Sequence, residues 1–307
     1  MKRSSLPIYQ EPPEEKAVAR GRFPSWLHRK IPSGGYLFKT NEILAKYRLN
    51  TVCEEAKCPN RMECYTRRTA TFLALGKECS RSCGFCDIDF SKNPKAPEAD
   101  EPKRVALSVK ELGLKHVVIT MVARDDLADG GAAALVAIMR EVKKENPSVT
   151  IEVLTSDFDG NLDALDLVLQ EKPEIFNHNI ETVRSLTPKV RHRATYERTL
   201  SVLSHAKKTG KALFVKSGIM VGLGEKEEEV KETISDLYRA GCDIITIGHY
   251  LQPSRKHLTV KAFISPEQFK LYADFGKSIG VRHMYAGPFV RSSYNAEGVL
   301  AEATEKH

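Results

Sequence analysis

Cysteines gather in one short stretch near the amino terminus of this 307-residue chain. Six of the seven lie between positions 53 and 86. They form two triplets with the spacings C-x4-C-x5-C and C-x3-C-x2-C, made up of Cys53, Cys58, Cys64 and of Cys79, Cys83, Cys86. Thiolates bind soft metal ions and carry redox chemistry, so this density of thiols predicts a metal centre rather than ordinary packing.

Three kinds of site would use such triplets. Disulfides are disfavoured, because the chain is far longer than a disulfide-stabilised mini-protein and carries no secretory signal. Zinc usually closes its site with four Cys or His ligands, whereas each triplet here offers three thiols with no His between them. An iron–sulfur cube held by three thiols keeps one iron open for another ligand. The triplets therefore favour two iron–sulfur clusters, each with one unusual or exchangeable ligand.

The second triplet has a specific setting. It follows the apolar run Ala70–Leu75, which ends at Gly76 and predicts a buried strand that leads into a loop. The sequence CSRSCGFC, with Phe85 directly before its last cysteine, resembles the signature of the radical S-adenosylmethionine (SAM) superfamily. The resemblance implies that the open iron chelates the amino and carboxylate groups of SAM. It also implies one-electron cleavage to a 5′-deoxyadenosyl radical, which attacks unactivated C–H bonds.

Composition and charge bear on partners and location. A chain that is 41% hydrophobic and 28% charged is typical of a globular protein. The net charge of +7 comes without a dense Lys/Arg block with interleaved aromatics, so we expect no nucleic-acid partner. No apolar run reaches the length of a membrane span, and we expect no membrane partner. The amino terminus lacks the apolar core of a signal peptide, and thiols kept for metal suit a reducing compartment. We therefore expect a cytoplasmic protein.

Apolar runs and helical patterns alternate from residue 70 onward. Near-continuous Val/Ile/Leu runs joined by helical crossovers predict parallel strands that are covered on both faces. Six such units predict an α/β fold, a partial (βα)6 TIM-like barrel, whose site lies at the carboxyl ends of the strands. The expected strands are Thr71–Leu75, His116–Thr120, Thr150–Leu154, Glu174–His178, Leu213–Val221 and Asp243–Ile247, and the expected helices include Gly131–Lys144, Thr195–Lys208, Glu225–Ala240 and Pro266–Ile279.

The chain divides into three expected parts. Residues 1–66 form an amino-terminal extension that carries the first triplet, with an extended arm up to about residue 40. A short helix is expected over Asn41–Arg48, capped by Thr40 or Asn41. Residues 67–285 form the barrel, and residues 286–307 form a closing segment with the motif RSSY.

Polar residues occur at several expected strand ends. Arg124, Asp125 and Asp126 follow the second strand, and the polar run Asn177–Thr182 ends the fourth. Amides and a carboxylate in that run suit the amine, carboxylate and ribose diol of a cofactor, and Arg191 suits a carboxylate. Each of these side chains also has an ordinary structural explanation, as a helix cap, a buried hydrogen-bonding group or a solvated charge.

Together these pieces resemble the lipoyl synthase family. The matching segments run in order along almost the whole chain: CEEAKCPNRMEC, FLALGKECSRSCGFCDID, RDDLADGGA, FNHNIETV, VKSGIMVGLGE, YLQPSRKHL and GPFVRSSY. The resemblance implies a sulfurtransferase that inserts two sulfur atoms, at C6 and C8 of an octanoyl chain. That chain is amide-linked to a lysine of a carrier, either the lipoyl domain of a 2-oxoacid dehydrogenase E2 or the glycine-cleavage H protein. Ferredoxin or flavodoxin would supply the electrons.

The resemblance also implies roles for single residues. Cys79, Cys83 and Cys86 would hold the [4Fe–4S] cluster that cleaves SAM. A second, auxiliary [4Fe–4S] cluster, which gives up its sulfur and is consumed, would be held by Cys53, Cys58 and Cys64. The fourth ligand of the auxiliary cluster would be Ser293, with Ser292 as the alternative. A serine oxygen binds iron less strongly than thiolate, which suits a cluster that must come apart.

Further roles concern the serine and SAM. Arg291 would help to control release of the serine. Asn179, Glu181 and Lys216 would line the SAM pocket, and Arg191 would meet a carboxylate of substrate or cofactor. The chain departs from the family at Met121-Val122-Ala123 and at His249, where Gln is common, but every cluster ligand is intact.

Two alternatives remain at this stage. One is another radical SAM sulfur-inserting enzyme that acts on a free small molecule. The other is a non-enzymatic metal protein, such as a cluster carrier or a zinc-bound adaptor, although this alternative leaves the barrel and its polar strand ends unexplained.

Overall fold

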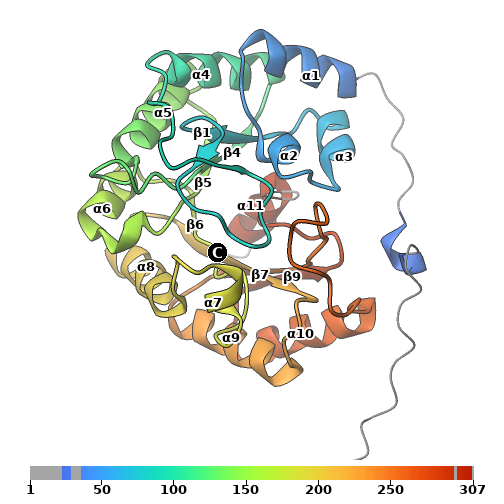
Figure 1. Cartoon of the computed structure of the whole chain (residues 1–307). Coiled ribbons are helices and arrows are strands. Elements are labelled where there is room, and N and C mark those ends of the chain that lie inside the picture. Colours follow the sequence, from blue (N-terminus) through green and yellow to red (C-terminus); the bar gives the residue numbers. More distant parts are fainter. Residues whose placement is uncertain (1–22, 29–35, 294–295, 306–307) are drawn as a thin grey trace, which may run out of the picture.

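A curved sheet of seven parallel strands forms the centre of the protein, seen in a computed structural model that describes residues 23–28, 36–293 and 296–305 (Figure 1). The strand order is β1-β4-β5-β6-β7-β8-β9. Their bounds are β1 Thr71–Ala74, β4 His116–Met121, β5 Thr150–Leu154, β6 Ile175–Asn177, β7 Phe214–Val221, β8 Ile244–His249 and β9 His283–Gly287. Because β1 and β9 are the two edges of the described sheet, the barrel is open, as the sequence predicts.

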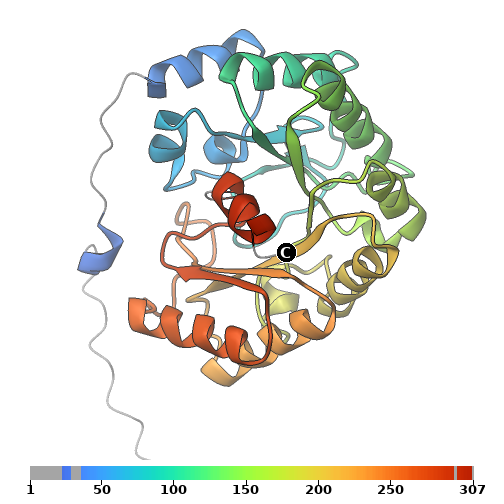
Figure 2. The same cartoon turned by 180° about the vertical axis from the view of Figure 1, so that it is seen from behind.

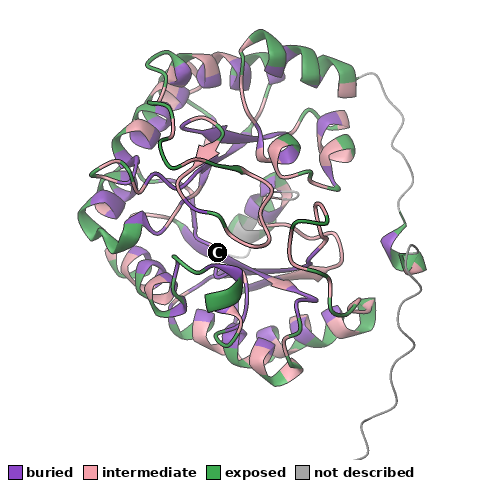
Figure 3. Cartoon of the chain, viewed as in Figure 1, coloured by how far each residue is buried: buried purple, intermediate pink, exposed green. Residues whose placement is uncertain are grey.

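Helices surround the sheet on its outer side (Figures 1 and 2). They are α4 Glu101–Leu112, α5 Ala132–Glu145, α6 Leu162–Gln170, α8 Tyr196–Thr209, α9 Glu227–Arg239 and α10 Pro266–Ser278. Every residue of β4 and β8 is buried, whereas the helices have their exposed faces on the outside (Figure 3). Burial on both faces explains why the strands read as continuous apolar runs instead of alternating patterns.

The seventh strand, β9, is absent from the six expected strands. Its sequence HMYAG mixes polar and small residues, and only His283 and Met284 are fully buried. The strand forms because it pairs with β8 over Ile244–Gly248, which no local pattern reveals.

The first triplet precedes the barrel. It lies on α2 (Val52–Glu55), α3 (Arg61–Thr66) and the turn between them, while α1 (Tyr36–Lys46) packs against α3. The expected start of α1 at residue 41 is wrong, because the helix begins at Tyr36. Thr40 lies inside the helix and does not cap it, since its hydroxyl donates to the Tyr65 carbonyl oxygen at 2.8 Å.

The remaining elements are short, apart from one helix near the carboxyl terminus. The loop with the second triplet carries β2 (Glu78–Cys79) and β3 (Asp89–Phe90), and further short helices are η1 (Ser25–Leu27), η2 (Phe158–Gly160) and α7 (Thr187–Val190). Helix α11 (Ala296–Glu305) lies across the end of the barrel that faces the viewer in Figure 2. Its Val299 and Leu300 pack against the first residues of β6, β7 and β8.

The division into residues 1–66, 67–285 and 286–307 stays a prediction. Within the described parts of the chain, no helix is both long and apolar enough to cross a membrane.

Candidate functional site

A cavity of about 340 Å³ opens at the carboxyl ends of the strands. The loops that border this cavity face the viewer in Figure 1. Most of the residues proposed from the sequence line it, namely Cys58, Cys79, Cys83, Cys86, Asn179, Glu181, Arg191, Arg291, Ser292 and Ser293. The fold therefore brings the second triplet, one cysteine of the first and the RSSY serines to one space.

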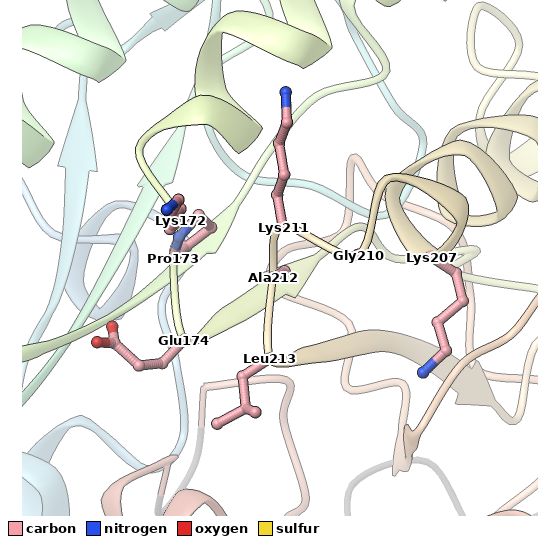
Figure 4. Close-up of a pocket in the computed structure, with 8 residues that line it drawn as sticks. All are labelled: Lys172, Pro173, Glu174, Lys207, Gly210, Lys211, Ala212 and Leu213. Carbon is pink, nitrogen blue, oxygen red and sulfur yellow. The ribbon is translucent and has the colours of Figure 1, made fainter.

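A second hollow, of about 440 Å³, lies at the opposite ends of the strands (Figure 4). It is lined by residues just before β6 and β7, including Lys172, Glu174 and Lys211. It contains none of the proposed site residues. Barrels of this type use the carboxyl ends of their strands, so the cavity at those ends is the candidate active site.

The first triplet is held by a compact turn. The Cys58 N–H donates to the Cys53 carbonyl oxygen at 3.1 Å, and the Cys64 N–H donates to the Asn60 carbonyl oxygen at 2.9 Å. Burial, with the neighbouring Cys58 thiol, raises the pKa of Cys53 to about 11. Burial raises the pKa of Cys64 to about 12, and the other two thiols add to the effect. The three thiols therefore lie close enough to influence one another.

The second triplet lies in a loop that is tied to the barrel. The Gly84 N–H donates to the Val190 carbonyl oxygen at 3.1 Å, and the Leu258 N–H donates to the Gly84 carbonyl oxygen at 3.0 Å. Burial raises the pKa of Cys83 to about 11 and that of Cys86 to about 12, with contributions from the other thiols of the same triplet. Without metal, these thiols are protonated at neutral pH, so cluster binding must release protons.

The donor set of each triplet suits an iron–sulfur cube. Each triplet offers three thiols with no His between them. A four-iron cube takes each thiolate at a different corner, so three thiols would hold three corners and the fourth corner would be open to another ligand. Among the residues that the structure describes, no group of three Cys, His, Asp or Glu side chains is arranged to hold a single metal ion.

Arg81, inside the loop of the second triplet, fastens that loop to the barrel. Its guanidinium donates to Asp125 through Nε at 2.8 Å and Nη2 at 2.7 Å, and its Nη1 lies 2.7 Å from Asp157 Oδ1. Burial alone would raise the pKa of Asp157, but the charge and hydrogen bond of Arg81, together with His178 and a backbone N–H, outweigh burial and hold this pKa below its usual value. Sequence reasoning missed Arg81 and Asp157, because they lie 76 positions apart (157 − 81) and only the fold brings them together.

Glu181, Asn179 and Arg191 form a polar wall after β6. Arg191 Nη1 donates to the Asn179 carbonyl oxygen at 2.7 Å. Burial raises the pKa of Glu181, and Arg191 opposes this shift. Glu181 has a φ of 69°, a left-handed conformation that is uncommon outside glycine and is often found at functional sites. A carboxylate and a guanidinium in one cavity suit the ammonium and carboxylate groups of an amino acid.

Lys216 lies in the barrel interior. It is fully buried, and its Nζ lies 3.0 Å and 3.1 Å from the two carboxylate oxygens of Glu152. Asn177 Nδ2 donates to the same carboxylate at 2.8 Å. Lys216 is not among the residues that line the cavity. Its role in a SAM pocket stays a prediction.

The RSSY segment runs along the cavity after β9. Arg291, Ser292 and Ser293 all line the cavity, and the Ser292 hydroxyl donates to Asn179 Oδ1 at 2.8 Å. Arg291 donates through Nη1 to the Val290 carbonyl oxygen at 2.7 Å. The segment thus lines the same cavity as the second triplet and Cys58 of the first.

Known families match the amino-terminal region and the barrel region of the chain. The model of the radical SAM superfamily matches residues 73–237, and the model of the N-terminal domain of lipoyl synthase matches residues 2–58. A lipoyl synthase of Protochlamydia amoebophila is 64% identical over 303 residues, which cover 98% of this chain and 94% of that protein. This chain belongs to the lipoyl synthase family. A lipoyl synthase of Chlamydia trachomatis is 55% identical over 94% of this chain and 93% of its own length.

Solved structures share the fold of this lipoyl synthase family member at low sequence identity. SuiB of Streptococcus suis bound to S-adenosylmethionine gives a TM-score of 0.56 at 12% identity, over 74% of this chain and 53% of SuiB. The FeFe-hydrogenase maturase HydG of Carboxydothermus hydrogenoformans gives 0.52 at 15% identity, over 87% of this chain and 78% of HydG. Membership of the lipoyl synthase family makes the chain a radical SAM enzyme that inserts sulfur, so the non-enzymatic alternative is not supported.

Asp157→Asn tests the connection made by Arg81. The change removes one of two carboxylates from a buried arginine, and breaking such a pair costs about 3–5 kcal/mol. We expect the second triplet to lose its cluster, so that iron falls from roughly eight to roughly four per chain, because each cube holds four. Iron analysis after anaerobic reconstitution measures this loss. The control is Asp159→Asn, whose carboxylate is 70% exposed and pairs with Arg198. Full iron content in Asp157→Asn would contradict the role of Arg81.

Glu152→Gln tests the buried pair in the barrel. It leaves the Lys216 charge without its counter-ion, and we expect the free energy of unfolding to fall by about 3–5 kcal/mol. Urea denaturation measures the loss, and the double variant Glu152→Gln/Lys216→Met should recover most of it. A loss below about 1 kcal/mol in the single variant would contradict the assignment. The KM for SAM of the double variant tests the predicted pocket role of Lys216 separately.

Proposed function

We propose that this protein converts a carrier-bound octanoyl chain to a lipoyl group by inserting sulfur at C6 and C8. The observation that carries the proposal is that Cys58 of the first triplet and all three cysteines of the second line one cavity, together with Ser292 and Ser293. In a member of the lipoyl synthase family, this shared lining supports a radical source and a sulfur source that would act on one substrate in the same cavity.

The second triplet would hold the catalytic cluster. When bound, that cluster supplies one-electron cleavage of SAM and so a radical that takes hydrogen from an unactivated C–H bond. The protein's own side chains would bind and orient SAM. Arg191 would meet its carboxylate, Glu181 its ammonium group, and Asn179 its ribose hydroxyls or its amino acid part.

The first triplet would hold the auxiliary cluster, which is a substrate because its sulfide enters the product. Cys53, Cys58 and Cys64 would bind three of its irons and Ser293 the fourth. Because a serine oxygen is a poorer partner for iron than a thiolate, Ser293 would be the ligand that leaves first. Arg291, two positions before it in sequence, would stabilise the hydroxyl after release.

Each sulfur insertion balances in atoms and electrons. One SAM takes up one electron and ends as methionine and 5′-deoxyadenosine, which carries the hydrogen atom lost from the substrate carbon. The carbon radical then bonds a sulfide of the auxiliary cluster, and the cluster iron accepts one electron. Two insertions therefore consume two SAM molecules and one auxiliary cluster.

The cavity also suits the alkyl chain. Its wall includes apolar side chains from several strand ends: Leu73, Val122, Leu154, Ile219, Met220 and Leu251. Apolar walls bind an alkyl chain and exclude water, which would otherwise compete for reactive species.

The partners follow from the same proposal. The substrate would be the octanoylated lipoyl domain of a 2-oxoacid dehydrogenase E2 or the octanoylated glycine-cleavage H protein, and ferredoxin or flavodoxin would supply electrons. A cytoplasmic location is proposed as well, supported by the seven cysteines, all of which are free thiols.

Substrate choice is tested by incubating the reconstituted enzyme and SAM with an octanoylated lipoyl domain or with free octanoate. We expect thiolation of the protein-bound chain, detected by mass spectrometry as the gain of two sulfur atoms. Thiolation of free octanoate alone would favour the small-molecule alternative.

Cys58→Ala tests the division of labour between the triplets. We expect SAM cleavage to survive, because the second triplet is intact, while sulfur insertion stops. Chromatography of 5′-deoxyadenosine and mass spectrometry of the carrier measure the two outputs. Loss of both, with the second cluster still present by iron analysis, would refute the assignment.

A further inference from the structure

The residues that reach from β9 to the two serines, 288–293, form a strap along the cavity, and one side chain ties it to the first triplet. Asn60 Nδ2 donates to the Phe289 carbonyl oxygen at 2.8 Å, across 229 positions of sequence. Asn60 is only 1% exposed, so the donor of this bond is buried, while Phe289 on the acceptor side is half-buried. The tie therefore connects the amino-terminal extension directly to the segment that carries Ser293.

Asn60 is also built into the first triplet. It lies two positions after Cys58, and its carbonyl oxygen accepts the N–H of Cys64 at 2.9 Å. One residue thus binds the triplet through its backbone and the strap through its side chain. A shift of the strap would break the side-chain bond, and a shift of the triplet would break the backbone bond.

The strap is held from the barrel side as well. The Ser292 hydroxyl donates to Asn179 Oδ1 at 2.8 Å, and the His249 N–H donates to the Pro288 carbonyl oxygen at 3.3 Å. Gly248 leaves room for this path, because a Cβ at that position would collide with the Val290 carbonyl oxygen. A Cβ at Gly218 would lie 2.8 Å from Asn179 Oδ1 and 2.9 Å from Ser292 Oγ. The strap therefore fits against the barrel along a closely defined path.

We propose that Asn60 is a positioning residue that fixes the strap so that Ser293 reaches the auxiliary cluster. This inference rests on the proposed function and deepens it. Ser292 is engaged with Asn179 on the barrel side, which leaves the next hydroxyl, Ser293, for iron. Asn60 acts from the first triplet, where its bond to Phe289 sets the distance between strap and triplet. Without it, the fourth corner of the auxiliary cluster loses its ordered ligand.

The test uses Asn60→Ala and Asn60→Asp, the second of which keeps the shape but replaces the donor by a carboxylate that repels the Phe289 carbonyl oxygen. The matched control is Asn41→Ala. Asn41 is in the same extension and also donates to a backbone carbonyl, that of Leu37 at 2.9 Å, but the bond stays within its own helix.

The first measurement is amide hydrogen exchange over residues 286–293 in the full-length protein without clusters. In both Asn60 variants we expect exchange in this segment to quicken about tenfold, as loss of one buried hydrogen bond predicts. Asn41→Ala should exchange like the unaltered protein in this segment. Unchanged exchange in both Asn60 variants would overturn the proposal.

The second measurement is the ratio of sulfur inserted to SAM cleaved, with the reconstituted enzyme and an octanoyl-lysine peptide. We expect this ratio to fall at least about fivefold in the Asn60 variants, because the serine ligand is misplaced. A purely structural defect would lower both outputs together and leave the ratio unchanged, and that result would also overturn the proposal. If the unaltered enzyme inserts no sulfur, the proposed function fails, while the exchange measurement still decides whether Asn60 holds the strap.

Discussion

The parallel pairing of the strands is the constraint on which the site depends. Each strand from β1 to β9 in the seven-stranded sheet runs in the same direction as its neighbour, so all carboxyl ends meet at one rim. The loops that follow these strands must then share one space, whatever their distance in sequence. The second triplet, a polar wall after β6 and a strap after β9 line that space, together with Cys58 from the segment that precedes β1.

Charge pairing makes this crowded rim and interior stable. A buried charge without a partner destabilises the folded state, and several buried charges of this chain are paired with opposite charges. Arg81 holds the loop of the second triplet through Asp125 and Asp157, while Lys216 and Glu152 neutralise each other inside the barrel. The three charged groups Arg81, Asp125 and Asp157 serve the geometry of the site, whereas the Lys216–Glu152 pair serves the fold. All five side chains are fully or largely buried.

Local signals in the sequence predicted much of this arrangement, and long-range contacts account for the rest. The cysteine spacings and the apolar runs are local patterns, so the triplets, the open barrel and most of its helices could be predicted. Strand β9 was missed because its pairing with β8, rather than its composition, makes it a strand. The bonds from Arg81 to Asp157 and from Asn60 to Phe289 join positions that are distant in sequence, so no local spacing pattern predicts them. The expectation that Lys216 lines the SAM pocket comes from the family resemblance. Its Nζ lies 3.0 Å from Glu152 Oε1 in the interior, a long-range contact that no local pattern shows, and its pocket role stays a prediction.

The most direct test of the account is an anomalous iron map from an anaerobic crystal of the reconstituted enzyme with SAM. The account predicts two separate four-iron cubes, one on Cys53, Cys58 and Cys64 and the other on Cys79, Cys83 and Cys86, both facing the same cavity. Iron shared between the two triplets, or cubes that face unrelated spaces, would contradict it.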